Sequence, residues 1–320
     1  MEYFFETAVK CKNSKKKNST HLAIVNDGKV RYLISNDGTL RNHARKVLAY
    51  NVSSYSKKLG MLMRSLTLIP DFVLKLAHLG KTVSVVLPDE IADTMTEVAE
   101  NRWLNKKWGY NIIVGSYVEK QKIVIQCFTE DGNDTAIYFK VCSDNAKAEI
   151  ENETNYLREP IRSKLFENPK LCYSKLQKDG AQFNIQVTEE FTGTKVNPEL
   201  TQEIYQLFQE IAGFRKQETN DGELLCFSHG DFTPWNLRKN SDGKYIVFDW
   251  EYCRMRFYGF DLIHYLWQIE NKLNGKNKDA AIKAAIETAK EYDERLRVYS
   301  DEKIAHMYFH ELKTQFGEIL

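Results

Sequence analysis

Apolar and polar residues alternate in short runs through much of the first two thirds of the chain, and apolar residues recur every three or four positions through most of the last third. Alternation predicts strands, and the longer spacing predicts helices. Near the start, β-rich runs at 21–26 and 29–35 flank Asp27-Gly28, a strong hairpin signal. The pattern then predicts a turn at 36–38, helices at 53–68 and 89–103, a strand at 82–87, and a solvated loop over the lysine-rich run 10–17.

Three further alternating runs, joined by short polar turns, predict an antiparallel meander in the middle of the chain. They lie at 111–117, 122–128 and 135–141, and a charged helix at 144–158 and a strand at 183–191 follow. Later helices are predicted at 198–214, 260–273, 280–298 and 301–320. We therefore expect an α+β chain in three parts: an accessory α+β module at 1–108, a sheet domain at 109–193 and a helical domain at 194–320.

Composition limits the classes of function. The chain has 320 residues, of which 42% are hydrophobic and 28% charged, as in globular proteins. Its 45 Lys and Arg nearly balance 44 Asp and Glu, so we expect no nucleic-acid partner. No uncharged apolar run reaches the ~20 residues of a membrane-spanning helix, and the start lacks a secretory signal. Six dispersed cysteines without a C-x-x-C pair indicate reduced thiols in a cytoplasmic protein and no zinc site.

A polar patch between two predicted helices contains the candidate chemistry. Asp242-Gly243 is a hairpin signal, so Asn236 and Asp249 are expected at the open ends of two neighbouring strands. An amide oxygen and a carboxylate suit Mg²⁺, which binds through a few protein oxygens, waters and substrate phosphates. Asp231, five residues before Asn236, is a candidate base for an attacking hydroxyl.

These residues resemble a known pair of loops. The run from His229-Gly230-Asp231 to Asn236, followed by Phe248-Asp249-Trp250-Glu251, is similar to the catalytic and metal loops of the aminoglycoside phosphotransferase and choline kinase group. The resemblance implies a bilobal protein-kinase-like fold, with an antiparallel-sheet N-lobe and a helical C-lobe. It also implies that a hydroxyl attacks the γ-phosphate of ATP with Mg²⁺ as cofactor.

The same resemblance assigns supporting roles. His229 would orient the loop, and Asp261, in a segment similar to the family's G-x-D-L, would brace it. Lys140 would hold the phosphates, with Glu153 as its ion-pair partner and Glu149 in reserve. Backbone groups near Glu189 and Phe191 would face the adenine, and Gly115 and Ser116 would lie over the phosphates. The turn at Gly115 has a single glycine where protein kinases have three.

The acceptor is the least determined part. Only 35 residues separate Gly193 from His229, so the acceptor pocket is expected to draw on the C-terminal helices or the N-terminal module. Residues 31–68 resemble N-terminal regions of phosphotransferase-like proteins found with surface-polysaccharide biosynthesis enzymes, which favours a sugar or glycan-precursor hydroxyl. An aminoglycoside is one alternative, and choline or another amino alcohol, which would call for an aromatic cage, is a second.

A nucleotide-binding pseudokinase scaffold is the alternative from another class. It is disfavoured because the base, both metal ligands and the lysine are all present. His306 and His310, four residues apart, are interpreted as a helix face and not as a metal site. The aromatic cluster between Trp250 and Trp267 is interpreted mainly as core. The oligomeric state stays open.

Overall fold

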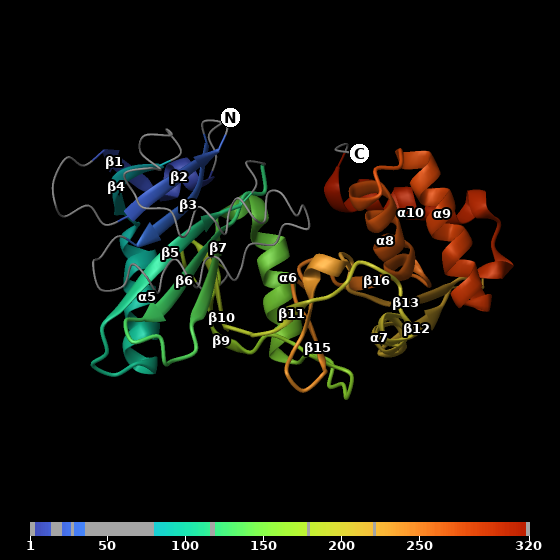
Figure 1. The fold of residues 1–320 in the computed structure, drawn as a ribbon, viewed down its shortest axis with the longest axis horizontal. Coiled ribbons are helices and arrows are strands. Elements are labelled where there is room, and N and C mark those ends of the chain that lie inside the picture. Colours follow the sequence, from blue (N-terminus) through green and yellow to red (C-terminus); the bar gives the residue numbers. More distant parts are fainter. Residues whose placement is uncertain are drawn as a thin grey trace. The chain divides into compact units, whose positions relative to one another are not determined.

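The computed structural model describes residues 4–13, 21–26, 29–35, 80–115, 119–177, 180–219 and 222–317. The predicted turns at 27–28 and 36–38 and the predicted helix at 53–68 lie outside the described residues. The chain divides into two compact units, which are labelled by element in Figure 1. The first comprises Met1–Thr154 and Lys170–Glu190, and the second comprises Asn155–Pro169 and Phe191–Leu320.

One antiparallel sheet forms the first unit. Its nine strands follow the order β1-β4-β2-β3-β5-β6-β7-β10-β9. The predicted hairpin and meander are both confirmed as antiparallel neighbours within it. The strands are β1 (Lys10–Asn13), β2 (His21–Asn26), β3 (Lys29–Ser35), β4 (Gly80–Val86), β5 (Trp108–Val114), β6 (Ile123–Thr129), β7 (Ile137–Cys142), β9 (Leu171–Lys175) and β10 (Asn184–Glu189).

A single apolar core crosses the boundary that the sequence analysis places at residue 108. Strand β3 pairs with β5, so the sheet runs on through that boundary. The core packs helix α1 (Phe4–Ala8) and helix α5 (Asp89–Arg102) against the sheet, and Figure 1 shows α5 along it. Leu33 and Met95, from before residue 108, share this core with Ile125 and Phe139, from after it. Alternating apolar positions thus bury one face of all these strands together.

Two sequence expectations for the first unit need correction. Residues 10–13 are not loop, because they form strand β1, which pairs with β4 at the edge of the sheet. Lysines are frequent on edge strands, where their charge discourages pairing with another chain, so a lysine-rich run does not exclude a strand. Strand β9 was also missed, since its half-exposed residues carry little periodicity.

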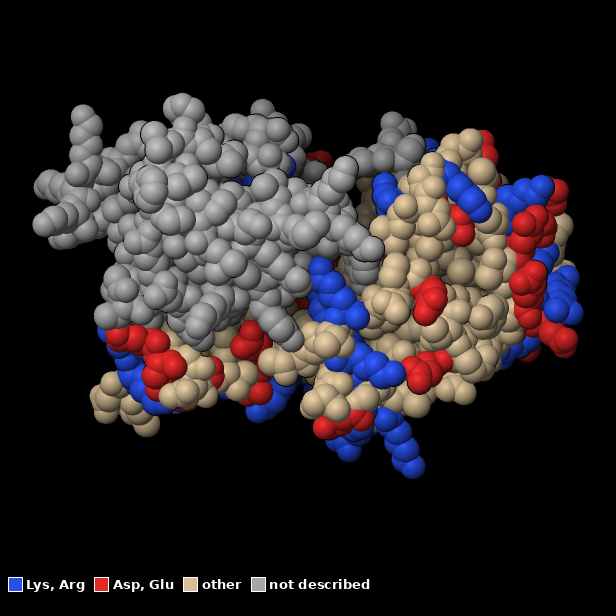
Figure 2. Space-filling model, in the orientation of Figure 1, with Lys and Arg blue, Asp and Glu red and all other residues tan. Residues whose placement is uncertain are grey.

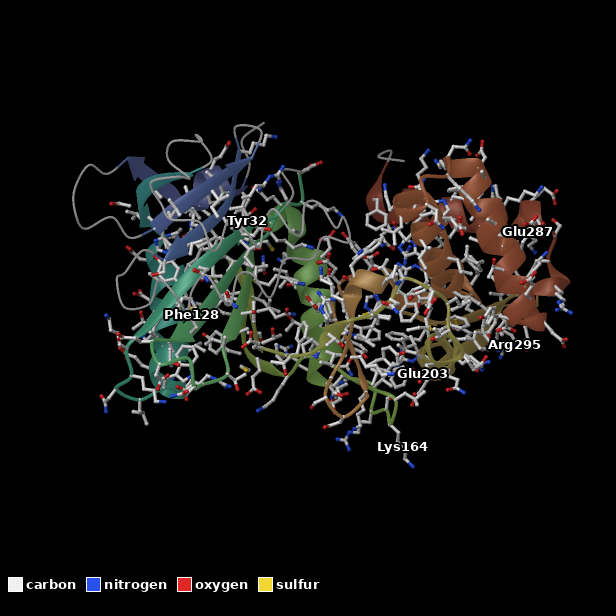
Figure 3. All side chains as sticks on the ribbon, in the orientation of Figure 1. Tyr32, Phe128, Lys164, Glu203, Glu287 and Arg295 are labelled. Atoms are coloured by element: carbon white, nitrogen blue, oxygen red, sulfur yellow. The ribbon has the colours of Figure 1, made fainter. Side chains whose placement is uncertain are left out.

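A smaller second apolar cluster also lies in this unit. Phe128 is one of its buried members and Tyr32 packs against it, and both are labelled in Figure 3.

Helices and two small sheets form the second unit. Helix α6 (Lys147–Arg158) contains the division between the units. The short strands form the orders β11-β14-β15-β8 and β12-β13-β16. They are β8 (Phe166–Glu167), β11 (Thr194–Lys195), β12 (Lys216–Glu218), β13 (Leu224–Ser228), β14 (Leu237–Lys239), β15 (Tyr245–Val247) and β16 (Arg254–Phe257). The helices of this unit are α7 (Gln202–Gly213), α8 (Phe260–Gln268) with a π-helical turn (Ile269–Leu273), α9 (Lys278–Tyr292) and α10 (Asp301–Phe316). Its 3-10 turns lie at Pro234–Asn236 and Glu294–Val298, and a further 3-10 turn, at Asp144–Ala146, precedes α6 in the first unit.

Side-chain caps set where these helices start. The predicted helix at 198–214 begins only at Gln202, because Thr201 Oγ1 accepts a hydrogen bond from the backbone N–H of Ile204 (3.3 Å). Asn277 and Ser300 cap α9 and α10 in the same way. A capping oxygen satisfies one of the N–H groups that the first helical turn leaves without a partner. The cap residue Thr201 therefore fixes the start of α7, which periodicity alone places four residues too early.

The visible face of the second unit carries charges of both signs. Figure 2 shows Lys and Arg interspersed with Asp and Glu over its helices. Ion pairs such as Lys290–Asp301 (2.5 Å) join them across helix ends. Within the part of the chain that the structure describes, no helix is both long and apolar enough to cross a membrane.

The shared core predicts long-range effects of a substitution in the N-terminal strands. Leu33→Ala removes a fully buried side chain of β3 and should lower the free energy of unfolding by about 2–5 kcal/mol. Because the core is continuous, amide hydrogen exchange should also accelerate in β6 and β7, beyond residue 108. Val86→Ala, at a half-exposed position, serves as the control. Faster exchange confined to β2–β4 would instead indicate that residues 1–108 form a separate core.

Burial of His21 predicts a dependence of stability on acidity. Its ring donates to the Tyr110 carbonyl through Nε2 (3.1 Å), and burial lowers its pKa from 6.5 to about 4. Between pH 6.5 and 4 His21 is protonated in the unfolded chain and neutral in the folded chain. The free energy of unfolding should therefore fall by about 3 kcal/mol as the pH drops from 6.5 to 4. Above pH 6.5 this contribution is constant.

His21→Gln should flatten that slope in denaturant titrations at several pH values. The slope should not vanish, because burial also lowers the pKa of His229 and acts with the same sign. His310→Gln, at an exposed position of α10, is the matched control and should keep the wild-type slope. An unchanged slope in His21→Gln would contradict the assignment.

Candidate active site

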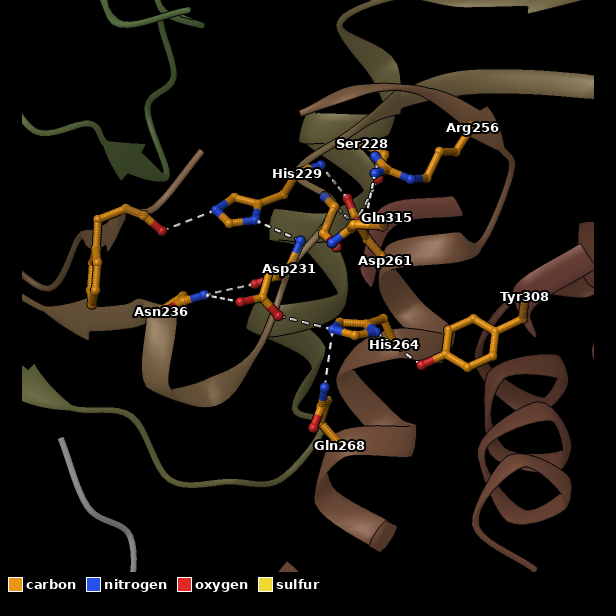
Figure 4. Close-up of polar contacts among 12 residues, drawn as sticks. Ser228, His229, Asp231, Asn236, Arg256, Asp261, His264, Gln268, Tyr308 and Gln315 are labelled. Carbon is orange, nitrogen blue, oxygen red and sulfur yellow. Dashed lines mark hydrogen bonds and ion pairs between the residues drawn. The ribbon is translucent and has the colours of Figure 1, made fainter. Parts of the chain in front are cut away.

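The catalytic loop predicted from the sequence leaves strand β13 and is held by one buried carboxylate (Figure 4). Asp261, in the first turn of α8, accepts hydrogen bonds from Ser228 Oγ (2.8 Å), His229 N (2.6 Å) and Gly230 N (3.0 Å). Three donors on one carboxylate offset the cost of burying its charge. The bracing contact inferred for Asp261 is thus present, and it determines the path of three consecutive residues.

Gly230 is required by the path of this loop. Its φ of 87° lies in the left-handed region, where glycine carries no steric penalty. A Cβ at this position would lie well inside van der Waals contact with the backbone carbonyl of Tyr252. The glycine of the His-Gly-Asp sequence therefore permits both the turn and the close approach of the chain that follows β15.

His229 is fully buried and bonded to backbone at both ring nitrogens. The backbone N–H of Asp231 donates to Nδ1 (3.2 Å), so Nε2 carries the proton and donates to the carbonyl of Phe248 (3.0 Å). Burial lowers the pKa of the imidazole below its usual value, although the carboxylates of Asp261, Asp231 and Asp249 oppose this. A neutral ring with both nitrogens engaged ties the catalytic loop to the chain before Asp249 and is unsuited to act as a base.

Asp231 and Asn236 meet across the loop. The amide nitrogen of Asn236 donates to Asp231 Oδ2 (2.9 Å) and to the Asp231 carbonyl (2.9 Å). Because the nitrogen uses its protons on Asp231, the amide oxygen is the atom that can bind a cation. The Asp231 side chain is about 22% exposed, so its carboxylate is accessible from solvent.

The second predicted metal ligand lies on the neighbouring strand. Strands β14 and β15 form the antiparallel hairpin expected from Asp242-Gly243, and the backbone N–H of Phe248 donates to the carbonyl of Asn236 (3.2 Å). Asp249 follows immediately, with a φ of 71°, which is unusual for a residue with a side chain. The hairpin thus places Asn236 and Asp249 at its open end. An amide oxygen and a carboxylate fit a hard cation such as Mg²⁺ that also binds water and phosphate.

Among the residues that the structure describes, no three His, Cys, Asp or Glu side chains gather into a metal-binding group. His306 and His310 lie at exposed positions of α10, with ring centroids 6.5 Å apart. Asn236 and Asp249 remain the metal ligands that the sequence predicts.

The structure adds site residues that sequence reasoning missed. His264 Nε2 lies 3.0 Å from Asp231 Oδ1, and its Nδ1 lies 2.9 Å from the hydroxyl of Tyr308 (Figure 4). Gln315 Nε2 donates to the carbonyl of Gly230 (3.1 Å) and is itself held by Arg256 (2.6 Å). His264 follows Asp261 by three residues on a predicted helix, so it shares its face, and this spacing could have identified it. No local pattern marks Tyr308 or Gln315.

The first unit contains the predicted ion pair. Lys140 Nζ on β7 lies 2.6 Å from Glu153 Oε2 on α6, with both side chains largely buried. In the amide orientation that satisfies its neighbours, Gln186 of β10 also donates to Glu153 (3.1 Å). The reserve candidate, Glu149, binds Lys120 (2.5 Å). A buried pair of this kind loses more when one partner is removed than it contributes as a pair, so each residue holds the other in place.

The remaining predicted nucleotide contacts are only partly described. The chain passes from the first unit into the second between Glu190 and Phe191, within the segment where the hinge was predicted. The backbone N–H groups of Glu189 and Glu190 already donate to the carbonyls of Lys170 (2.9 Å) and Ala136 (2.8 Å). Gly115 N donates to the carbonyl of Lys122 (3.2 Å), and a Cβ at Gly115 would lie 2.7 Å from that oxygen, so its glycine is explained by hairpin packing. Ser116 lies outside the described residues.

The aromatic cluster is mainly core, as predicted, and its member Tyr252 is only half-buried. Trp250, Phe260, Tyr265 and Trp267 are all buried within the second unit. They therefore do not form an open cage for a cationic acceptor.

Comparison with known proteins identifies the family of this chain. The first unit is an antiparallel sheet that carries the Lys140–Glu153 pair, and the second is a helical unit that carries the braced His-Gly-Asp loop and the Asn–Asp hairpin, as in the protein-kinase-like fold. The family model for choline/ethanolamine kinase matches residues 138–303, more than half of the chain. The chain therefore belongs to the choline/ethanolamine kinase family. No curated protein matches this sequence significantly.

Solved structures give more distant likenesses. The amicoumacin kinase hAmiN, in complex with AMP-PNP, Ca²⁺ and Ami, is 14% identical, with 64% of this chain and 82% of that chain covered and a TM-score of 0.36. Aminoglycoside phosphotransferase APH(4)-Ia is 10% identical, with 71% and 93% covered and a TM-score of 0.43. Choline kinase LicA from Streptococcus pneumoniae is 14% identical, with 69% and 86% covered and a TM-score of 0.40. The family assignment rests on the match over 138–303 and not on these likenesses.

Two glycines of positive φ provide a matched test of the loop. Gly243→Ala, in an open turn with a φ of 81°, should cost only the conformational strain of about 1–2 kcal/mol. Gly230→Ala should cost about 1–3 kcal/mol more in the free energy of unfolding, because its Cβ collides with the Tyr252 backbone. Chemical denaturation of both variants measures the difference, and equal losses would contradict the packing described here.

Proposed function

We propose that this protein transfers the γ-phosphoryl group of ATP to a hydroxyl of a small molecule. The single observation that carries the proposal is the Asp231 carboxylate, which remains partly exposed while Asn236 and His264 hold its two oxygens. Family membership over 138–303 supports the same reaction class. Positioning of the hydroxyl, and not covalent catalysis, is the main protein contribution to such transfers.

Each residue has one proposed role. Asp231 accepts the hydroxyl proton as the bond to phosphorus forms. Asn236 and Asp249 hold Mg²⁺, which supplies positive charge to the phosphate oxygens when bound. Lys140, fixed by Glu153, contacts the nucleotide phosphates, while backbone groups near Glu189 and Phe191 face the adenine. His229 and Asp261 keep the loop in its working shape.

Two acceptor classes are candidates. A sugar or glycan-precursor hydroxyl is favoured by the resemblance of residues 31–68 to proteins of surface-polysaccharide biosynthesis. An amino alcohol is favoured by the family match, since the matching family is described as choline/ethanolamine kinase. Burial of the aromatic cluster weighs against the second, because a quaternary ammonium group is commonly bound against open aromatic faces.

An acceptor panel tests the proposal. Purified protein with Mg·ATP is incubated with choline and ethanolamine, with sugars and glycan fragments, and with aminoglycosides, and ADP release is followed together with the mass gain of each acceptor. Phosphorylation of one class supports the proposal and identifies the acceptor. Nucleotide binding without transfer to any of them, or to metabolites of a cell extract, would favour the pseudokinase scaffold.

Substitution of the two aspartates should separate chemistry from binding. Asp231→Asn should lower kcat by about 10²–10⁴ while leaving the affinity for Mg·ATP intact, because only the base is lost. Asp249→Asn should weaken Mg²⁺-dependent nucleotide binding itself, measured by calorimetry with a non-hydrolysable analogue. Asp242→Asn, in the exposed hairpin turn, is the control. Wild-type turnover in Asp231→Asn would exclude the mechanism.

A further inference from the structure

We propose that His264 and Tyr308 form a relay that fixes the orientation of the Asp231 carboxylate and so sets the rate of transfer. Both are positioning residues, since they reach the substrate only through Asp231. The inference rests on the proposed function, and it names two residues outside the motifs by which that function is recognised. It starts from the unusual surroundings of a buried histidine on α8.

A carboxylate held at one oxygen can still rotate. Rotation about the last bond of an aspartate side chain has broad, two-fold preferences, so one hydrogen bond leaves its plane poorly defined. Asn236 donates to Oδ2 (2.9 Å) from within the loop, and His264 Nε2 reaches Oδ1 (3.0 Å) from α8. Two donors from separate elements, one on each oxygen, define the plane. Each oxygen retains a lone pair, through which an acceptor hydroxyl can be bound.

Tyr308 favours the tautomer of His264 that can donate a hydrogen bond to Asp231. Its hydroxyl lies 2.9 Å from His264 Nδ1, and both side chains are fully buried. Burial raises the pKa of the phenol well above its usual value, so the hydroxyl keeps its proton and can donate it to Nδ1. The imidazole proton then resides on Nε2, where it faces the carboxylate.

Gln268 also lies near this nitrogen and can compete for it. Its amide nitrogen is placed 3.3 Å from His264 Nε2, while its buried oxygen Oε1 has no hydrogen-bond partner. With the ring proton on Nε2, Gln268 can compete with Asp231 for it only if the amide makes a half-turn that brings its oxygen to this atom. The charged Asp231 oxygen remains the stronger acceptor, because hydrogen bonds to ionised groups are roughly twice as strong as neutral ones.

The burial of His264 gives the relay its rigidity. Its ring is stacked on Phe260, with centroids 5.7 Å apart, and lies against Trp267 and Tyr308. An apolar side chain would fill this space without leaving polar atoms to satisfy. A histidine here holds Asp231 from the protein interior, on the side away from the exposed part of the carboxylate.

Kinetics with matched variants test the positioning role. His264→Leu should lower kcat about 10–100-fold with both KM values unchanged, because binding is intact and only orientation is lost. His264→Gln, which can place an amide N–H near the former Nε2, should recover part of kcat. Tyr308→Phe should also lower kcat, and by less than His264→Leu. His306→Gln, at an exposed position of α10, is the control.

Nitrogen-15 NMR of labelled imidazoles tests the relay without turnover. The His264 resonances, assigned among the seven histidines by their loss in His264→Gln, should show a protonated Nε2 and an unprotonated Nδ1 at neutral pH. Tyr308→Phe should shift Nδ1, and Asp231→Asn should shift Nε2. A proton on Nδ1, or resonances insensitive to both substitutions, would overturn the relay.

The two proposals fail in different ways. If wild-type protein phosphorylates an acceptor and folded His264→Leu keeps its kcat, positioning by His264 is wrong while the proposed function stands. If no acceptor is phosphorylated, the proposed function fails, and the NMR experiment alone decides whether the relay exists.

Discussion

The rest of the site depends on the hydrogen bonds that the Asp261 carboxylate accepts. It accepts them from the hydroxyl of Ser228 and from the backbone N–H groups of His229 and Gly230, so the chain that leaves β13 must bend at this place. From that bend His229 reaches the carbonyl of Phe248. The loop that follows β13 and the segment before Asp249 are thus linked through the His229 side chain. Because the donors are mostly backbone groups, the chemistry of the loop depends on chain geometry more than on side-chain identity.

Rigidity is built differently in the two units. The sheet unit is held by one apolar core that joins strands from both sides of residue 108, and within it the Lys140–Glu153 pair is a largely buried charge pair. In the helical unit, buried polar side chains form chains of hydrogen bonds that end at the loop, through His264 and Tyr308 and through Arg256 and Gln315. Such networks are costly when half satisfied, and this makes the loop's shape well defined.

The sequence predicts those parts of the site that are encoded locally. The spacing of Asp231, Asn236 and Asp249 and the Asp242-Gly243 turn are contiguous signals, and the structure places these residues on one loop and hairpin. Periodicity likewise located the strands of the meander. Tyr308 and Gln315 could not be found in this way, since they meet the loop only through tertiary packing. Lysines in residues 10–13 concealed an edge strand, because the same charge suits a loop and a sheet edge.

The contact between Gln315 and the carbonyl of Gly230 has a consequence for biosynthesis. The two residues are 85 positions apart, and the later one belongs to helix α10. At ribosomal rates of about 5–20 residues per second, the loop waits roughly 4 to 17 seconds for this support to be translated. A nascent chain that already carries the whole loop therefore lacks this support until residue 315 has been synthesised.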